Sequence, residues 1–150
     1  MIIYFSSASA EAKYPLTSFD KALYKLGLEN VNLIKLSSVL PENASIVRTL
    51  PRPIKIGEIV KAVYTHITTN KGIASCGLAV GMKKGGGGLF YEYAQHNASQ
   101  KEVKQVLQEM IKEAFEIREW ELDSIEYALT EAKPSHHYAT ALAVAAFFDK

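Results

Sequence analysis

Glu92 lies in a stretch of sequence that could hold a carboxyl group away from water. Residues Leu89–Ala94 are otherwise apolar or aromatic, and alternation along a strand puts Glu92 on the same face as Phe90 and Ala94. A carboxyl group in apolar surroundings keeps its proton to higher pH and can act as a proton donor near neutrality. A solvent-facing carboxylate on an edge strand fits the same pattern, and composition alone favours that interpretation. The role of Glu92 therefore depends on its surroundings.

Asp20 and the pair Ser37-Ser38 also carry reactive groups, but each has an ordinary explanation. Asp20 follows Thr17 by three residues, which is typical of a capping box at the start of a helix. A pair of adjacent serines is common, and neither lies in the Gly-x-Ser-x-Gly turn that would support a hydrolase triad. Neither feature indicates a function by itself.

Two further motifs favour structural interpretations. Gly85–Gly88 is followed by a strand rather than by Lys-Ser or Lys-Thr and a helix, so it predicts a hairpin tip and not a phosphate loop. His136 and His137 are adjacent and have no cysteine or carboxylate at metal-ligand spacing. We therefore expect an exposed loop there and no metal site.

The hydrophobic pattern predicts the elements that must position these residues. One helix has Thr17 as its cap and stops at Gly27, and a second follows the capping box that begins at Ser99. The expected strands, in chain order, are Ile2–Phe5, Val31–Leu36, Ala74–Met82, Leu89–Ala94, Ile125–Leu129 and Tyr138–Phe148. The period of the last, alanine-rich segment also fits a helix, and we favour a strand. Two segments are expected as loops, Ser6–Ala10 and Pro51–Pro53. Strands mixed with two separated helices predict a single layered α/β domain.

Composition narrows the classes of function. The chain has 150 residues, of which 48% are hydrophobic, and this is enough for one core. A net charge of +1 lacks the basic excess typical of nucleic-acid binding, and no apolar run approaches the roughly 20 residues that span a bilayer. Cys76 is the single cysteine, which fits a reducing compartment. We expect a cytoplasmic protein that binds neither nucleic acid nor membrane.

Three segments share the sequence pattern of one known family. They are Leu16–Asp20, Asn30–Pro41 and Gly86–Tyr93. Because it has these three segments in this order, the chain resembles the pyruvoyl-dependent arginine decarboxylases. The resemblance covers essentially its whole length. A pair of serines is not specific by itself, but the position of Ser37-Ser38, directly after Asn30–Leu36 and between the other two segments, is typical of this family.

The resemblance implies that the chain cuts itself between Ser37 and Ser38. The Ser38 hydroxyl would attack the Ser37 carbonyl and convert the peptide bond to an ester, and β-elimination would then break the chain. Residue 38, left as dehydroalanine, would hydrolyse to a covalent pyruvoyl group. A β chain of residues 1–37 and an α chain of residues 38–150 would result. Serine is required because it supplies both the nucleophilic oxygen and the leaving group on its Cβ.

The resemblance also assigns roles and an architecture. It implies conversion of L-arginine to agmatine and CO2, with Glu92 as the proton donor and Asp20 binding the substrate guanidinium. Val31 and Ser37 would lie in the substrate pocket, and Asn32 would act in positioning or processing. The implied fold is a layered α/β/β/α sandwich, assembled as a homotrimer whose active sites are shared between neighbouring subunits.

Several positions depart from the family pattern. Pro41-Glu42-Asn43-Ala44 lacks a second proline and a glycine common in the family, Glu29 replaces an expected glycine, and Ala94 replaces a second acid. These departures leave two alternatives open. One is decarboxylation of another amino acid, suggested by Glu29. The other is an unprocessed, non-catalytic paralogue that partners an active subunit, suggested by the altered segment after the serines.

Overall fold

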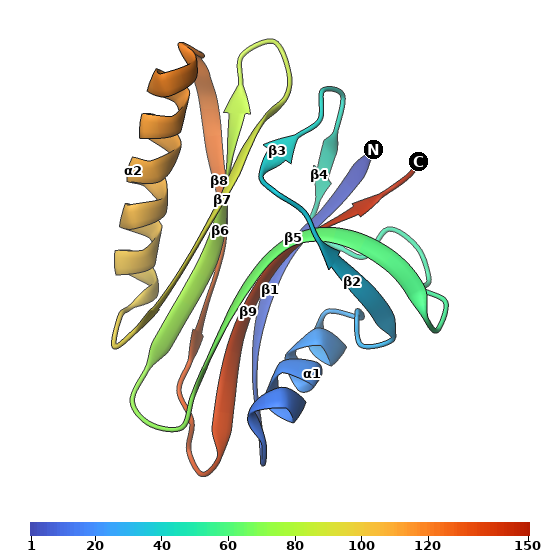
Figure 1. Cartoon of the computed structure of the whole chain (residues 1–150), viewed down its shortest axis with the longest axis vertical. Coiled ribbons are helices and arrows are strands. Elements are labelled where there is room, and N and C mark those ends of the chain that lie inside the picture. The colour runs from blue at the N-terminus through green and yellow to red at the C-terminus, as the bar shows by residue number, and fades with distance from the viewer.

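Nine strands and two helices form four layers in the computed structural model, which describes residues 1–150 (Figure 1). The strands are β1 Ile2–Ala12, β2 Val31–Lys35, β3 Val39–Leu40, β4 Ser45–Val47, β5 Glu58–Thr69, β6 Ala74–Lys83, β7 Gly88–His96, β8 Leu122–Ala132 and β9 Tyr138–Phe148. The helices are α1 Pro15–Lys25 and α2 Gln100–Arg118.

Two sheets stack face to face between the helices. The five-stranded sheet has the order β2-β5-β9-β1-β4, and the four-stranded sheet has the order β3-β7-β6-β8. One apolar cluster fills the space between the sheets, a second lies under α1 and a third lies under α2. Figure 1 shows the two helices on the outer faces of this stack. The predicted α/β/β/α sandwich is therefore confirmed.

The first strand is longer than the sequence pattern indicated. Ser6–Ala10 was expected as a loop because its residues are small, but it continues β1 to Ala12. Each of its residues pairs with the antiparallel strand β9, from Ser6 opposite Val144 to Ala10 opposite Thr140. Small residues fit here because Ala8 and Ala10 pack in the apolar cluster under α1, and the Ser7 hydroxyl donates to the Leu129 carbonyl oxygen of β8 at 2.8 Å. The tertiary packing overrides the local loop signal.

The two helices begin differently. At α2 the Ser99 side chain accepts a hydrogen bond from the Glu102 N–H, so the predicted cap is confirmed. At α1 the predicted cap is wrong, because the helix starts at Pro15 and Tyr14 precedes it without a capping side chain. Asp20 lies beyond the first turn and is solvent-exposed, so its interpretation as a capping residue is also wrong. Neither helix has the combination of length and apolar character that crossing a membrane requires.

The chain crosses from one sheet to the other between β2 and β3. Strand β2 ends at Lys35 on an edge of the five-stranded sheet, and β3 begins at Val39 on an edge of the four-stranded sheet. The three connecting residues, Leu36–Ser38, belong to neither strand. Such a short connection places Ser37 and Ser38 between an edge of one sheet and an edge of the other, with Ser37 exposed and Ser38 partly buried.

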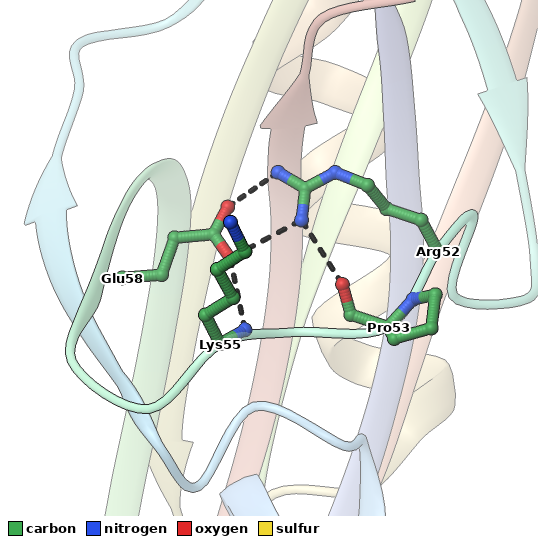
Figure 2. Close-up of polar contacts among 4 residues, drawn as sticks. All are labelled: Arg52, Pro53, Lys55 and Glu58. Atoms are coloured by element: carbon green, nitrogen blue, oxygen red, sulfur yellow. Dashed lines mark hydrogen bonds and ion pairs between the residues drawn. The ribbon is translucent and has the colours of Figure 1, made fainter.

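The loop before β5 is held by an ion pair. Arg52 forms a two-pronged contact with the Glu58 carboxylate and also donates to the Pro53 carbonyl oxygen at 3.0 Å (Figure 2). The Lys55 N–H donates to Glu58 Oε2 at 3.1 Å. The hydrogen bond from Arg52, followed by that from Lys55, lowers the pKa of Glu58 to about 2. This cluster fixes the loop that lies against the start of β2.

Glu11 holds the connection between β8 and β9 in place, and we predict that its hydrogen bonds stabilise the fold except in acid. Its carboxylate accepts the backbone N–H groups of Ser135, His136 and His137, which lower the pKa of Glu11 to about 2. Because the folded-state pKa is depressed, the stabilisation is full above about pH 4.5 and is lost as the pH falls through 2. Glu11→Gln should therefore have a lower melting temperature than wild type at pH 7. The difference should narrow in melting curves recorded from pH 5 to pH 2, and an unchanged difference would contradict this account.

Candidate active site

A pocket of about 240 Å³ opens beside the crossing between the two sheets. Its lining comes from the end of β2, the crossing, β5 and β7, and consists of Lys35, Leu36, Ser37, Ser38, Val63, Phe90, Tyr91 and Glu92. The lining combines polar residues, among them the two serines, with apolar and aromatic ones. A small cavity of mixed character, with a few convergent polar groups, is typical of a ligand site.

The peptide that joins the serines is anchored on both sides. The Leu36 N–H donates to the Ala62 carbonyl oxygen on β5 at 2.8 Å. On the other side, the Phe90 N–H of β7 donates to the Ser38 carbonyl oxygen at 2.8 Å. The chain before the Ser37–Ser38 peptide is therefore bonded to the five-stranded sheet, and the chain after it is bonded to the four-stranded sheet. These two attachments limit the conformations that the peptide can adopt.

Glu92 lies on the wall of this pocket and contacts a cation. Its Oε1 is 3.0 Å from Lys35 Nζ, and the exposed fractions of the two side chains are 38% and 50%. Lys35 Nζ also lies 5.3 Å from the centre of the Tyr64 ring. The expectation of wholly apolar surroundings for Glu92 is therefore wrong in the single chain. The strand alternation was predicted correctly, but the sequence pattern of one strand cannot reveal a lysine that reaches it from the other sheet.

Other reactive groups lie outside the pocket. Cys76 is buried between the sheets, and burial raises the pKa of its thiol to about 12, so it does not supply a nucleophile. No three His, Cys, Asp or Glu side chains are grouped where they could hold a metal ion. A larger depression of about 450 Å³, beside the turn between β5 and β6, contains none of the predicted site residues. The smaller pocket is the candidate site, because two serines, a carboxylate and a lysine all line it.

One known protein family matches almost the whole length of this chain. The sequence profile of the family described as pyruvoyl-dependent arginine decarboxylase matches residues 2–150. The chain belongs to this family. A pyruvoyl-dependent arginine decarboxylase of Pyrococcus furiosus is 37% identical over 145 residues, which cover 95% of this chain and 91% of that protein. The one from Thermococcus kodakarensis is 36% identical over 148 residues, with 97% and 93% coverage. The one from Methanocaldococcus jannaschii is 38% identical over 129 residues, with 83% and 76% coverage.

The structure brings together half of the residues that resemblance to the decarboxylase family singled out. Ser37, Ser38 and Glu92 line one pocket, although four strands, β3 to β6, lie between the serines and Glu92 in the sequence. Asp20, Val31 and Asn32 do not line it. Asp20 is exposed on α1, and Val31 and Asn32 lie at the opposite end of β2 from the serines.

Asn32 has a structural contact of its own. Its side-chain amide donates to the Gly57 carbonyl oxygen at 3.2 Å, and the Gly57 N–H donates to Asn30 O at 2.8 Å. These bonds attach the loop held by Arg52 and Glu58 to the start of β2. Its role in positioning or processing the decarboxylase stays a prediction.

Lys35 is the pocket residue that the sequence analysis missed. The sequence did contain a local signal, because lysine is the only charged side chain in Val31–Leu36 and lies two residues before Ser37. Its charge also affects a neighbouring group. Burial, and then the charge of Lys35, lower the pKa of His66.

The residues around Ser38 fit the pyruvoyl group that the family name implies. That group would be the remnant of residue 38 itself, so it needs a fixed backbone on its C-terminal side and little space. The bond from the Phe90 N–H to Ser38 O, and the pairing of Val39 with Leu89, provide the fixed backbone. The pocket beside residue 38 provides the space, and Glu92 lies in its wall.

Proposed function

We propose that the chain cleaves itself between Ser37 and Ser38 and then decarboxylates L-arginine to agmatine and CO2. The products of cleavage would be a β chain of residues 1–37 and an α chain of residues 38–150. One observation carries the proposal: in a member of the pyruvoyl-dependent arginine decarboxylase family, the Ser37–Ser38 peptide lines the same pocket as Glu92. The lone buried Cys76 fits a cytoplasmic setting, which we include in the proposal.

The bonds that form and break in cleavage belong to these two residues and to water. The Ser38 Oγ loses its proton and bonds to the Ser37 carbonyl carbon, the peptide C–N bond breaks, and the Ser38 nitrogen takes up the proton. Loss of the Ser38 Hα then breaks the Cβ–Oγ bond, and Ser37 leaves as a carboxylate. Water replaces the nitrogen of the remaining dehydroalanine, and ammonia is released. The anchored crossing favours this attack because it restricts the reacting peptide.

The cut would not release either new end from its sheet. Strand β2 keeps its parallel pairing with β5, from Val31 opposite Glu58 to Lys35 opposite Ala62. On the other chain, residue 38 keeps the hydrogen bond of its carbonyl oxygen to Phe90. Ser37 and residue 38 would therefore remain at the same pocket after cleavage.

The pyruvoyl group, once formed, supplies an electron sink for the electrons released when the substrate loses CO2. Glu92, on the pocket wall, would deliver a proton to the carbon that carried the carboxylate. The apolar wall of Leu36, Val63 and Phe90 would limit the access of water to that carbon.

We propose that Asp20 reaches this pocket from a neighbouring subunit of a homotrimer, and that Val31 and Asn32 contribute there too. Leu16 and Tyr24 lie one helical turn to either side of Asp20, and their exposed fractions are 76% and 68%. Large apolar side chains in line with an acid suit a contact between copies of the chain better than a solvated face. A shared site of this kind accounts for the position of Asp20 outside the pocket of a single chain.

Asp20→Asn should weaken arginine binding by the cleaved enzyme. A carboxylate that binds a guanidinium contributes charge-assisted hydrogen bonds of about 1.5–3 kcal/mol, so we expect KM for arginine to rise roughly 10- to 100-fold with little change in kcat. Asp123→Asn, which alters an exposed acid on β8, is the matched control. An arginine KM equal to that of wild type would remove Asp20 from the substrate site.

Decarboxylation of another amino acid is a second candidate, which one observation at Glu29 favours. Its Oε2 is buried without a hydrogen-bond partner, so this acid is available to a further polar group. The assay that separates the candidates compares the turnover of arginine, lysine, ornithine and histidine. We expect arginine to have the highest kcat/KM, and preference for another of these substrates would transfer the assignment to the second candidate.

A further inference from the structure

Lys35 is the only cationic side chain in the lining of the pocket. It lies on the strand that leads into the cleavage site, two residues before Ser37. Its Nζ contacts Glu92 Oε1 at 3.0 Å, and half of its side chain is exposed. An exposed ion pair of this kind contributes little to stability, so stability alone does not explain a lysine at this position.

Cleavage creates negative charge close to this ammonium group. When the Ser38 Oγ bonds to the Ser37 carbonyl carbon, the Ser37 carbonyl oxygen becomes an oxyanion. When the Cβ–Oγ bond of residue 38 later breaks, Ser37 becomes a carboxylate. The pocket therefore gains an anion at residue 37, where the intact chain has a neutral peptide group.

The length of a lysine side chain allows Lys35 to reach that anion. Two residues of extended chain span about 7 Å, which the flexible four-carbon stem of lysine can bridge. Both residues line the same small pocket, and Leu36 and Val63 make part of its wall apolar. Fixed charges aimed at a developing anion are most effective where such surroundings displace water.

We propose that Lys35 is a catalytic residue of the self-cleavage, and this inference rests on the proposed function. Its ammonium group moves from Glu92 to the Ser37 carbonyl oxygen, stabilises the oxyanion formed by the attack of Ser38, and then pairs with the Ser37 carboxylate. The electron pair of the broken Cβ–Oγ bond stays on the oxygen, which is then part of the Ser37 carboxylate beside Lys35. In the intact chain Glu92 competes for the same ammonium group, and after the cut its carboxyl group is released to face the pocket.

The competition between the two anions distinguishes this role from a structural one. If Lys35 and Glu92 act only as a structural pair, removing either member should affect cleavage in the same direction. If Lys35 stabilises the Ser37 oxyanion, removing Lys35 slows cleavage, whereas removing the charge of Glu92 does not slow it. The decisive comparison is therefore between Lys35→Met and Glu92→Gln.

The experiment measures the cleavage rate of newly made protein. Each full-length chain is produced by cell-free synthesis, and the fraction cut between Ser37 and Ser38 is followed over time by intact mass. Lys35→Met should be cut roughly 10- to 100-fold more slowly than wild type, near the lower end of the loss for a donor to an oxyanion because the lysine is half exposed. Lys35→Arg should recover most of the rate, and Glu92→Gln should be cut at least as fast as wild type. Lys84→Met, which removes an exposed lysine paired with Glu121 at 3.4 Å, is the matched control and should match wild type.

Each outcome has a distinct meaning, provided that thermal melting shows the variants to be folded. Equal rates for wild type and Lys35→Met would overturn the role of Lys35 and leave the proposed function intact. Equal slowing in Lys35→Met and Glu92→Gln would also overturn it, because it indicates a structural pair. Slower cleavage of the Lys84→Met control would also overturn the role of Lys35, because the loss of an unrelated lysine would then have the same effect. A wild-type chain that stays uncut would instead contradict the proposed function.

Discussion

Replacing Ser38 with alanine leaves a single uncut chain of about 16.6 kDa that has no reactive carbonyl group and no decarboxylase activity. Alanine has neither the hydroxyl group that attacks the Ser37 carbonyl nor an oxygen on Cβ that could leave. Both the cut and the cofactor are therefore lost together, which makes this the largest effect expected of any single substitution. Mass spectrometry of the denatured protein and an assay of CO2 release from arginine measure the two losses.

The matched control for this variant is Ser37→Ala. Residue 37 takes part in the cut through its carbonyl group, which alanine retains, so Ser37→Ala should still be cleaved at the same bond. Cleavage of Ser38→Ala between residues 37 and 38 would show that the hydroxyl group of Ser38 is not the nucleophile. An uncut Ser37→Ala chain would show that the side chain of residue 37 is needed as well.

Glu92→Gln should be cut between Ser37 and Ser38 and yet lose turnover, by about 10²- to 10⁴-fold in kcat. The amide has nearly the shape of the carboxyl group but cannot deliver a proton to the carbon that has lost CO2. The loss is measured as kcat for arginine, divided by the fraction of chains that mass spectrometry shows to be cut. This division separates a defect in proton transfer from a defect in processing.

Glu126→Gln is the control for loss of an ion-paired carboxylate. Glu126 lies on the same sheet and pairs with Arg48 at 3.3 Å, and 43% of its side chain is exposed, much as for Glu92. Glu126→Gln should keep the wild-type kcat. Normal turnover by cut Glu92→Gln protein would reassign proton donation to Tyr91, Tyr93 or a water molecule.

The sequence predicts regular elements well where side-chain period and burial agree. Ala74–Met82 alternates clearly and forms β6. The period of the alanine-rich segment Tyr138–Phe148 fits either a strand or a helix, and the preference for a strand is confirmed, because the segment forms β9 near the centre of the five-stranded sheet. The hydrophobic pattern gives a wrong prediction where small residues lie in a strand because of tertiary packing. Ser6–Ala10 looks like a loop in one dimension, whereas its pairing with β9 makes it the second half of β1.

The site shows a similar division between local and long-range information. Local alternation placed Glu92 on the correct face of its strand, but it could not show that Lys35 reaches Glu92 from the other sheet. The crossing between β2 and β3 also has no local signature, since it depends on which sheet each strand joins. Resemblance supplied the roles of Ser37, Ser38 and Glu92, and the structure adds that all three line one pocket.

The position of Asp20 shows a different limit. A single chain places this acid on the exposed surface of α1, away from the lining of the pocket. Leu16 and Tyr24 are exposed in the single chain, and the periodicity of α1 does not indicate whether another copy contacts them. Contacts between copies depend on the complementarity of their surfaces, which the hydrophobic pattern of a sequence does not predict.

The most direct test of the account is the intact mass of the purified wild-type protein under denaturing conditions, measured with and without borohydride reduction. We predict two fragments that end at Ser37 and begin at residue 38. The larger fragment should gain two hydrogen atoms on reduction, because its N-terminus carries a carbonyl group. A single species of about 16.6 kDa that borohydride leaves unchanged would contradict the account and favour an unprocessed partner of an active subunit.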